Sequence, residues 1–301
     1  MDKRVSVQVP ATTANLGPGF DCLGMALNMH NTVTLEEGAG YRCEVEITGE
    51  GAAFLPRDSS NLVIRAINTL FRRAFYRSPG WRLHLENRIP LQRGLGSSAA
   101  AIIGGLTAAN IIAGSPFSPH ELLLLAIEME GHPDNVAAAF LGGVVIIVEH
   151  EDSYLYARFF PPPGIRVCVV VPDFPLATKL ARSVLPEVIP FKDAVFNLGR
   201  VALLTFALRE GNWDLLSAAL RDRLHQPYRS ELIPGLGQVF KAAREAGAYG
   251  AVLSGAGPSV VAFAPPGSKA GEAMREAFRS HGFQAQVWDL EPSPQGARIL
   301  E

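Results

Sequence analysis

Apolar residues alternate with polar ones in several short segments of the first half of the chain. Valine occupies every second position over residues 5–9, and the same period recurs at 32–36, 41–47 and 81–85. A period of two places the apolar side chains on one face, as in half-buried strands. Each of these segments is therefore predicted to be a β-strand.

Other segments of this half carry the 3.6-residue period of helices. Asn61 is a candidate N-cap for a helix with an apolar stripe over 63–74. The segment 97–113 is apolar almost all round, which predicts a helix buried between layers. A third helix is expected to begin with a capping box at 118–121 and to end near Gly131.

The run of prolines at 161–163 marks the strongest break in the pattern, because proline has no N–H to donate to a sheet. We therefore predict an N-terminal domain over 1–158 and a C-terminal domain over 159–301. Further elements are expected as helices at 134–140, 195–210, 213–224, 236–246 and 269–280, and strands at 144–148, 165–171, 251–253, 260–264 and 283–288. This order predicts an α+β protein with a mainly antiparallel sheet in each half.

Composition narrows the classes of function. Of the 301 residues 48% are hydrophobic and 19% are charged, with a formal net charge of -2. Such a balance provides no basic surface for nucleic acid or for an anionic membrane, so neither is expected as a partner. The longest apolar stretch, 136–148, is too short to span a bilayer, and no apolar signal core precedes the first strand. A cytoplasmic location is expected.

Three scattered cysteines, Cys22, Cys43 and Cys168, form no CxxC pair. This spacing supports neither a disulfide framework nor a zinc site, and the expectation is buried free thiols.

The segment Pro90 to Ala100, PLQRGLGSSAA, carries the strongest chemical signal. Glycines at 94 and 96 allow main-chain N–H groups to approach an anion closely. A helix that begins at Ser97 adds unpaired N–H donors and the positive end of its dipole. Hydroxyls of Ser97 and Ser98 can contact phosphate oxygens or hydrated Mg²⁺. The segment predicts a phosphate-binding site.

Other glycine motifs fit this segment less well. A P-loop requires Gly-Lys-Ser/Thr, and the chain contains no Gly-Lys dipeptide. The degenerate dinucleotide pattern is matched at 94–99, but Pro90 and Arg93 interrupt the strand that should lead into it, and Glu121 lies in the first turn of a helix. From this motif alone, a glycine turn with a serine cap and no ligand stays open.

Two further segments concentrate turn residues and polar groups. PATTANLGPGFD at 10–21 follows the first strand, and SGAGPS at 254–259 joins two apolar strands. Each of these two segments by itself is typical of a tight turn. Together with the segment at 90–100, however, they are not three independent coincidences.

In this order and at these separations, the three segments resemble the signature motifs of the GHMP kinases. The resemblance covers nearly the whole chain, and the segments 14–21, 130–136 and 225–234 are similar to the homoserine kinase branch of that family. It implies a two-domain fold, with an N-terminal α/β domain like domain 2 of ribosomal protein S5 and a ferredoxin-like C-terminal domain. It also implies a homodimer that uses ATP and Mg²⁺ to phosphorylate the hydroxyl of L-homoserine, a step of threonine biosynthesis.

The resemblance implies roles for particular residues on the nucleotide side. The nucleotide-binding residues would be Pro90, Leu91, Arg93, Gly94, Leu95, Gly96, Ser97, Ser98, Ala99 and Ala100. Magnesium is expected at Ser98 and Glu128, with Glu130 as the second choice, since a hydroxyl and a carboxylate form a common minimal set for Mg²⁺.

On the substrate side, the resemblance assigns Asp21 to the ammonium group of homoserine. Arg182 and Arg229 are expected to hold the carboxylate, because a guanidinium can donate two parallel hydrogen bonds. The remaining substrate contacts are Asn15, His132 and Thr178. The catalytic set is Asn135, near the reacting hydroxyl, with Arg182, Ser98 and Glu128.

The catalytic base is left open between Asp134 and Asn135, and the expected role of Asp134 is to cap a helix. Three rival functions also stay open: a mevalonate-type kinase, a non-catalytic nucleotide-binding protein, and a lyase like the diphosphate decarboxylases.

Overall fold

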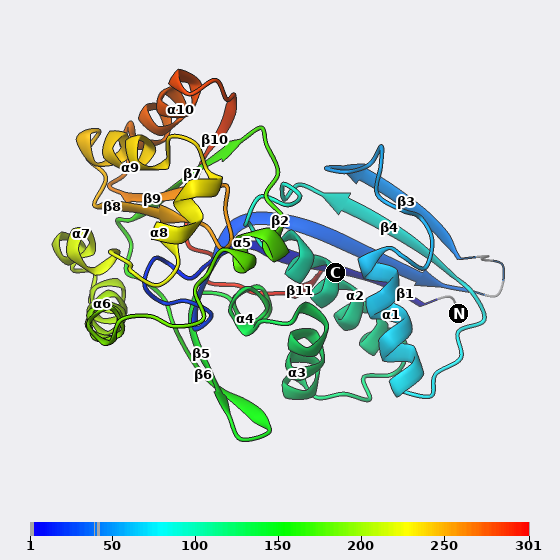
Figure 1. Ribbon diagram of the computed structural model, residues 1–301. Coiled ribbons are helices and arrows are strands. Elements are labelled where there is room, and N and C mark those ends of the chain that lie inside the picture. The colour runs from blue at the N-terminus through cyan, green and yellow to red at the C-terminus, as the bar shows by residue number, and fades with distance from the viewer. Residues whose placement is uncertain (1–2, 39, 41–42, 301) are drawn as a thin grey trace.

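The computed structural model describes residues 3–38, 40 and 43–300, and it contains two β-sheets with helices packed against each (Figure 1). The larger sheet has seven strands, in the order β11-β1-β2-β4-β3, with β5 paired to both β2 and β6. These strands are β1 (Lys3–Ala14), β2 (Leu23–Glu37), β3 (Glu44–Gly49), β4 (Trp81–Asn87), β5 (Val144–His150), β6 (Ser153–Phe159) and β11 (Arg298–Leu300). Residues 41 and 42 of the predicted strand at 41–47 lie outside the described residues.

The period-two prediction for the first half is confirmed by the strand register. Val7 pairs with Val33 across β1 and β2, and Leu35 pairs with Leu83 across β2 and β4. All four side chains are buried. The β1–β2 register shifts between Pro10 and Ala11, where proline cannot donate to the ladder.

Four helices cover one face of this sheet: α1 (Leu62–Arg73), α2 (Ser97–Ile112), α3 (Pro119–Glu130) and α4 (Pro133–Leu141). Helix α2 contacts β1, β2 and the other three helices, so the predicted burial of an all-round apolar helix is confirmed. Asn61 caps α1 through Val63 N, and Ser118 with Glu121 forms the capping box of α3. The predicted N-caps are therefore also confirmed.

The smaller sheet is antiparallel, in the order β10-β7-β9-β8. Its elements are β7 (Arg166–Pro172), α9 (Leu236–Glu245), β8 (Gly250–Leu253), β9 (Val260–Ala264), α10 (Ala270–Ser280) and β10 (Ala285–Leu290). This succession of strand, helix, two strands, helix and strand is the ferredoxin-like arrangement.

Alternate residues of β7 join two different cores. Val167, Val169 and Val171 pack into the large apolar cluster that includes the N-terminal sheet, whereas Cys168 and Val170 face α9 and α10. Because successive side chains of a strand point to opposite faces, this one strand links both domains.

The remaining elements connect the two sheets: α5 (Thr178–Ser183), α6 (Phe191–Glu210), η1 (Trp213–Leu215), α7 (Leu216–Ala219), α8 (Gln226–Arg229) and η2 (Ser230–Leu232). The prediction of one helix over 213–224 is wrong, because the helix ends at Ala219. Beyond it, Asp222 accepts hydrogen bonds from the backbone N–H groups of Leu224, His225 and Gln226, which starts α8 instead. Of the described helices, none is long and apolar enough to cross a membrane.

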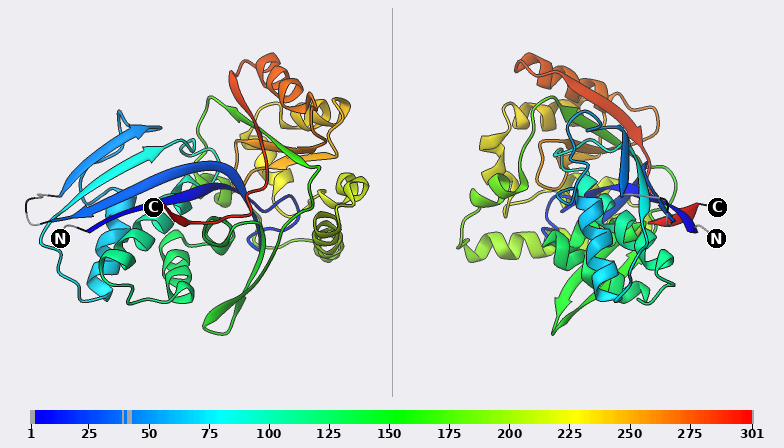
Figure 2. Two further views of the ribbon diagram at one scale, coloured as in Figure 1. Left: turned by 180° about the vertical axis from the view of Figure 1, so that it is seen from behind. Right: turned by 90° about the vertical axis from the view of Figure 1, so that its right-hand side faces the viewer.

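The chain leaves the larger sheet at Phe159, the end of β6, and enters the smaller sheet at Arg166, the start of β7. The predicted domain limits, 1–158 and 159–301, stay a prediction. Strand pairing does not follow these limits at the C-terminus. There β11, which lies in the predicted C-terminal domain, pairs with β1 of the N-terminal domain. Figure 2 shows the final strand crossing back along the larger sheet.

The cysteines are free thiols of different exposure. Cys168 is buried and Cys22 is half-buried, and burial raises the pKa of Cys22 to about 11. The expectation of a buried thiol is wrong for Cys43, which is exposed and directly precedes β3.

Candidate active site

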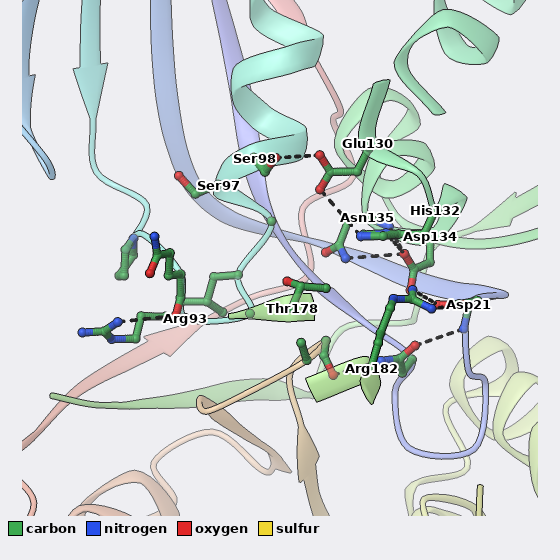
Figure 3. A pocket seen from close by; sticks show the side chains of 18 of the residues that line it. Asp21, Arg93, Ser97, Ser98, Glu130, His132, Asp134, Asn135, Thr178 and Arg182 are labelled. Atoms are coloured by element: carbon green, nitrogen blue, oxygen red, sulfur yellow. Dashed lines mark hydrogen bonds and ion pairs between the residues drawn. The ribbon is translucent and has the colours of Figure 1, made fainter. Parts of the chain in front are cut away.

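One pocket, with a cavity volume of about 160 Å³, brings together residues from both domains (Figure 3). Its lining comes from the loop after β1, the segment leading into α2, the ends of α3 and α4, the helices α5 and α8, and the turn after β8. All three glycine-containing segments contribute to it. The three segments that the sequence indicated to be related therefore lie around one pocket in the structure.

The segment before α2 has a shape that only glycine permits. Gly94 and Gly96 have φ angles of 73° and 69°. A Cβ at Gly96 would overlap Thr12 Oγ1, and one at Gly94 would overlap the carbonyl oxygen of Ser254. Gly96 is the N-cap of α2 and provides no side-chain acceptor. The first-turn N–H groups of α2 therefore lack a side-chain cap and are available to an anion.

Hydrogen bonds from the other two segments hold this loop in place. Thr12 N donates to Leu95 O at 3.1 Å. Ser254 Oγ donates to Gly94 O at 2.6 Å and also contacts Thr13 Oγ1 at 2.9 Å. The loop is thus fixed by its own carbonyl oxygens, while its N–H groups stay free for a ligand.

The ten residues predicted for the nucleotide divide into two groups. Most of them line the pocket, namely Pro90, Arg93, Gly94, Leu95, Gly96, Ser97 and Ser98. Ala99 and Ala100 are fully buried on the packed side of α2, and Leu91 borders a neighbouring cavity. The Arg93 guanidinium points away from the serines (Figure 3). It donates to Pro172 O at 3.1 Å, which ties the loop to the end of β7.

The structure brings Glu130, and not Glu128, into the pocket. Ser98 Oγ donates to Glu130 Oε2 at 2.6 Å, and the Glu130 side chain is 10% exposed. Glu128 is 62% exposed and pairs with Arg73 of α1 at 2.8 Å. The sequence-based preference for Glu128 as a metal ligand therefore does not fit the geometry.

Helical spacing explains this difference. Glu130 follows Leu123 by seven residues and Ala126 by four, so it lies on the buried side of α3. Glu128 follows Glu121 by seven residues, on the solvent side. The apolar face of the predicted helix contained the signal that distinguishes the two carboxylates.

A short chain of titratable groups lies at the junction of α3 and α4. His132 Nδ1 is 3.0 Å from Asp134 Oδ1, and His132 Nε2 is 3.8 Å from Glu130 Oε1. Burial raises the pKa of Glu130 and outweighs the opposing hydrogen bond from Ser98. Burial lowers the pKa of His132, but the hydrogen bond to Asp134 and the two carboxylate charges raise it overall. These shifts favour a charged imidazole between two carboxyl groups.

Asp134 does not occupy the capping position expected for it. The N-cap of α4 is His132, and Asp134 lies within the first turn, 2% exposed. Its Oδ1 accepts from Asn135 N at 2.7 Å as well as from His132. The carboxylate thus organises the start of α4 from inside the helix.

Asn135 is oriented by a residue that the sequence analysis did not single out. Thr12 Oγ1 donates to Asn135 Oδ1 at 2.7 Å, and Thr12 is fully buried. The Asn135 amide nitrogen lies on the other side, 3.4 Å from Asp134 Oδ1. Because Nδ2 carries two hydrogens, it can also donate into the pocket. The threonine pair in PATTANLGPGFD was the only hint of this role.

Two residues predicted to bind opposite ends of one substrate bind each other in this structure. Arg182 donates to both carboxylate oxygens of Asp21, at 2.7 and 2.9 Å. This hydrogen bonding, the largest effect on Arg182, raises its pKa further. Both side chains are about one-third exposed and border the pocket, as Figure 3 shows. The pair presents a positive and a negative group side by side.

Arg229 is a buried guanidinium aimed at the same pocket, with 1% of its surface exposed. Its Nε donates to Ala181 O, and its Nη1 donates to Gly255 O, each at 3.0 Å. Among the described residues, no carboxylate forms an ion pair with it. Burial lowers the pKa of Arg229 to about 10, so it stays charged at neutral pH.

A neutral histidine supports Arg229 from behind. His225 Nε2 donates to Gly17 O at 2.7 Å, so its Nδ1 is left to accept from Arg229 Nη1 at 3.2 Å. Burial lowers the pKa of His225, which agrees with a neutral ring. Asp222 in turn accepts from His225 N and fixes the start of α8.

Asn15 and Thr178 also line the pocket, but in different ways. Asn15 Nδ2 donates to Gly255 O at 2.9 Å, and its Oδ1 accepts from Asp21 N at 3.0 Å. The Nδ2 end of this amide therefore links the first glycine segment to the third, and the Oδ1 end holds the first segment together. Thr178, at the start of α5, is exposed to the pocket.

The donor set fits a magnesium ion that shares its ligands with a phosphate. Among the described residues, no group of three or more His, Cys, Asp or Glu side chains could hold a metal alone. Ser98 and Glu130 provide a hydroxyl and a buried carboxylate beside the anion-binding end of α2. Mg²⁺ usually binds through one or two such groups together with phosphate oxygens and water.

Comparison with known proteins gives similarity over the whole chain. The family model described as "GHMP kinases N terminal domain" matches residues 61–143, and "GHMP kinases C terminal" matches 206–283. Homoserine kinase of Carboxydothermus hydrogenoformans is 48% identical, over 97% of this chain and 96% of the relative. Homoserine kinase of Moorella thermoacetica is 46% identical, over 98% and 99%.

Solved structures agree with these similarities. Homoserine kinase from Cytophaga hutchinsonii superimposes with a TM-score of 0.87 at 32% identity, covering 99% of this chain and 97% of the other. Mevalonate kinase of L. major, in complex with R-mevalonate, gives a TM-score of 0.74 at 16% identity, covering 96% of each chain. The second similarity concerns the fold alone.

Proposed function

Because the chain belongs to the GHMP kinase family, and within it to the homoserine kinases, we propose that this pocket transfers the γ-phosphoryl group of ATP to L-homoserine. The products are ADP and O-phospho-L-homoserine, in a step of threonine biosynthesis. The two-domain α+β fold implied by the resemblance is confirmed by the family models and by the homoserine kinase structure. One observation carries the proposal: an anion-binding helix end and two arginines line the same pocket.

The polyphosphate of ATP would lie on the loop 94–98 and the N-terminal end of α2. Uncapped N–H groups and the helix dipole favour negative charge at this end. Ser98 and Glu130 would hold Mg²⁺ there, which replaces the expected Ser98–Glu128 pair. When bound, the ion neutralises charge on the phosphate oxygens.

Homoserine is a zwitterion and can therefore match a pocket that contains both signs of charge. Its carboxylate would contact Arg229 and Arg182, and its ammonium group would contact Asp21. The Asp21–Arg182 pair balances its own charges before the substrate arrives, so binding need not leave either group unpaired. A substrate that has a carboxylate but no ammonium group would provide no positive charge to pair with Asp21.

The side-chain amide of Asn135 faces the reacting hydroxyl in this arrangement. Its Oδ1 is occupied by Thr12, so Nδ2 donates to the hydroxyl oxygen and orients it. An amide cannot take up a proton, and Asp134 Oδ1 is already bonded to His132 and Asn135. Phosphoryl transfer is largely dissociative, so the hydroxyl loses its proton only as the new bond forms. Positioning and electrostatics would account for most of the rate.

A substrate panel in a coupled ADP assay tests the function directly. With ATP and Mg²⁺ we expect turnover of L-homoserine and little turnover of mevalonate, with O-phosphohomoserine identified by mass spectrometry. Preferential turnover of mevalonate would identify mevalonate, instead of L-homoserine, as the substrate. ATP binding without transfer to any alcohol would indicate a non-catalytic protein, and CO₂ release would indicate a decarboxylase.

Two homoserine fragments separate the charged contacts. 4-Hydroxybutyrate lacks the ammonium group assigned to Asp21, and 3-aminopropan-1-ol lacks the carboxylate assigned to the arginines. Each should be a much poorer substrate than L-homoserine. Equal turnover of either fragment would remove the corresponding residue from the proposed site.

The same family membership supports a cytoplasmic enzyme that forms a homodimer. Neither nucleic acid nor a membrane is expected as a partner. Separation of cell fractions tests the location, and light scattering tests the oligomeric state.

A further inference from the structure

One aromatic residue of the loop after β1 has no role in the reaction proposed above. Asn15 and Asp21 of this loop line the pocket, whereas Phe20, directly before Asp21, does not border it. Phe20 is only half-buried, and it joins neither of the two apolar clusters of the described residues. Packing in a hydrophobic core therefore does not account for a phenylalanine at this position.

The ring of Phe20 contacts three side chains from the second half of the chain. Cζ of Arg182 lies over the ring at 5.5 Å from its centroid, and Cζ of Arg229 lies over it at 5.3 Å. The ring of His225 is 5.3 Å away and tilted by 37°. The face of an aromatic ring carries partial negative charge and attracts a guanidinium within about 6 Å of its centroid. Both arginines of the substrate side therefore meet the same ring.

The two guanidinium groups need such a partner because their like charges repel. Burial lowers the pKa of Arg229, and the charge of Arg182 lowers it further. Asp21 forms an ion pair with Arg182, but among the described residues no carboxylate pairs with Arg229. A ring attracts both cations without accepting their hydrogen bonds, so it leaves N–H groups free for a carboxylate ligand.

Hydrogen bonds of Arg229 agree with this division of roles. Its Nε donates to Ala181 O and its Nη1 donates to Gly255 O, each at 3.0 Å. Its Nη2 forms no hydrogen bond with a described residue, although the side chain lines the pocket. The guanidinium is thus anchored on one side by carbonyl oxygens, contacts the Phe20 ring, and keeps one nitrogen for a ligand.

The backbone on both sides of Phe20 is held in place. His225 Nε2 donates to Gly17 O at 2.7 Å, and Asp21 N donates to Asn15 Oδ1 at 3.0 Å. Asn15 and Asp21 have φ angles of 67° and 56°. Left-handed non-glycine residues are strained and gather at functional sites, where the surrounding structure holds them. The loop therefore presents the Phe20 ring at a fixed place.

We propose that Phe20 is a positioning residue, which holds Arg182 and Arg229 together in the orientation that binds the carboxylate of the substrate. Its ring contacts all belong to the substrate side of the pocket. Loss of the ring should therefore weaken binding of homoserine and leave ATP unaffected. This role rests on the proposed function and adds a residue to it that does not itself touch the substrate.

Steady-state kinetics with L-homoserine and ATP tests the role. Phe20→Leu keeps an apolar side chain but removes the ring, and it should raise the KM for homoserine about tenfold. Both kcat and the KM for ATP should stay nearly unchanged. Phe20→Tyr keeps the ring and should restore a KM within about twofold of the unmodified enzyme. An unchanged KM in Phe20→Leu, or an equal rise in both variants, would overturn the proposal.

Phe196 of α6 provides a matched control. It is also half-buried, and Cζ of Arg200 and of Arg223 lie over its ring at 4.6 and 4.0 Å. Neither of these arginines lines the pocket. Phe196→Leu should therefore leave the KM for homoserine unchanged. If it raises this KM as much as Phe20→Leu does, the effect is a general loosening of the fold and the positioning role is wrong.

Substrate fragments show whether Phe20 acts through the arginines. For 4-hydroxybutyrate, which keeps the carboxylate, Phe20→Leu should lower kcat/KM by about the same factor as for L-homoserine. For 3-aminopropan-1-ol, which has no carboxylate, kcat/KM should change little. An equal loss with 3-aminopropan-1-ol would mean that Phe20 does not act on carboxylate binding.

A double-mutant cycle on the free energy of unfolding reports the Phe20–Arg229 contact without any substrate. Phe20→Leu and Arg229→Leu should be less than additive, because each removes the same contact. Arg182→Leu, at a one-third exposed position, provides a second cycle if Arg229→Leu does not fold. Additive effects in the cycle would overturn the proposal. Coupling in the cycle with no turnover of L-homoserine by the unmodified enzyme would instead reject the proposed function and leave the contact standing.

Discussion

The two sides of the proposed active site are built from different parts of the chain. The phosphate side uses main-chain N–H groups of a continuous segment, Gly94 to Ala99, at the start of one helix. The substrate side uses the charged side chains of Asp21, Arg182 and Arg229, which come from three distant segments of both domains. The first side depends on backbone shape and the second on charge. Substitutions should therefore affect ATP and homoserine separately.

The largest expected effect is on the substrate side. Arg229→Leu removes a buried cation that has no carboxylate partner among the described residues, and it should raise the KM for homoserine by about 10²-fold or more. The KM for ATP should change little. Arg223→Leu, which removes an exposed arginine paired with Asp193, is the matched control. Unchanged KM for homoserine in Arg229→Leu would exclude a substrate contact.

The second test asks which carboxylate belongs to the phosphate side. Glu130→Gln should lower kcat by about 10²-fold and raise the Mg²⁺ concentration needed for half-maximal rate. Glu128→Gln, on the same helix but paired with Arg73, should stay close to the unmodified enzyme. The reverse result would restore the sequence-based choice of Glu128.

Gly96→Ala tests whether backbone shape controls the phosphate side alone. The left-handed conformation costs about 1–2 kcal/mol for alanine, and its Cβ would also overlap Thr12 Oγ1. We expect the KM for ATP to rise about 30-fold, with a smaller change for homoserine. Gly114→Ala introduces alanine at a φ of 90° with no neighbour within 4 Å, and should leave both constants unchanged.

The smallest expected effect concerns the residue that links the two sides. Thr12→Val removes the hydrogen bond that orients Asn135 and should lower kcat about tenfold, with little change in either KM. Thr12→Ser keeps the hydroxyl and should recover most of the rate. If Thr12→Val changes only the melting temperature, Thr12 has a structural role and does not position Asn135.

Features that depend on neighbouring residues were predictable from the sequence. The caps at Asn61 and Ser118, the buried α2 and the alternating strand of residues 5–9 are all confirmed, because each follows from local spacing. The predicted helix over 213–224 failed, since Asp222 takes the backbone N–H groups that would have continued it. A side-chain acceptor of this kind competes with helix formation.

The choice between Glu128 and Glu130 shows a signal that was present but not used. Helical spacing puts Glu130 with Leu123 and Ala126, and Glu128 with Glu121. The resemblance to the GHMP kinases indicated that the metal-binding carboxylate lies on this helix, but not on which face of it. By contrast, the threonine pair in PATTANLGPGFD did not indicate which residue Thr12 would contact, because Asn135 lies 123 residues further along the chain.

The sequence by itself determined the elements, the glycine-serine loop and the family, because these depend on short-range periodicity and on motifs that are contiguous in the chain. Only the tertiary structure decided that Asp21 pairs with Arg182, that Arg229 is buried beside a neutral His225, and that large apolar side chains on one face of α6 are exposed. Burial and ion pairing are properties of side chains brought together across long loops. Their energies depend on distances and solvent exclusion that exist only after the chain has folded.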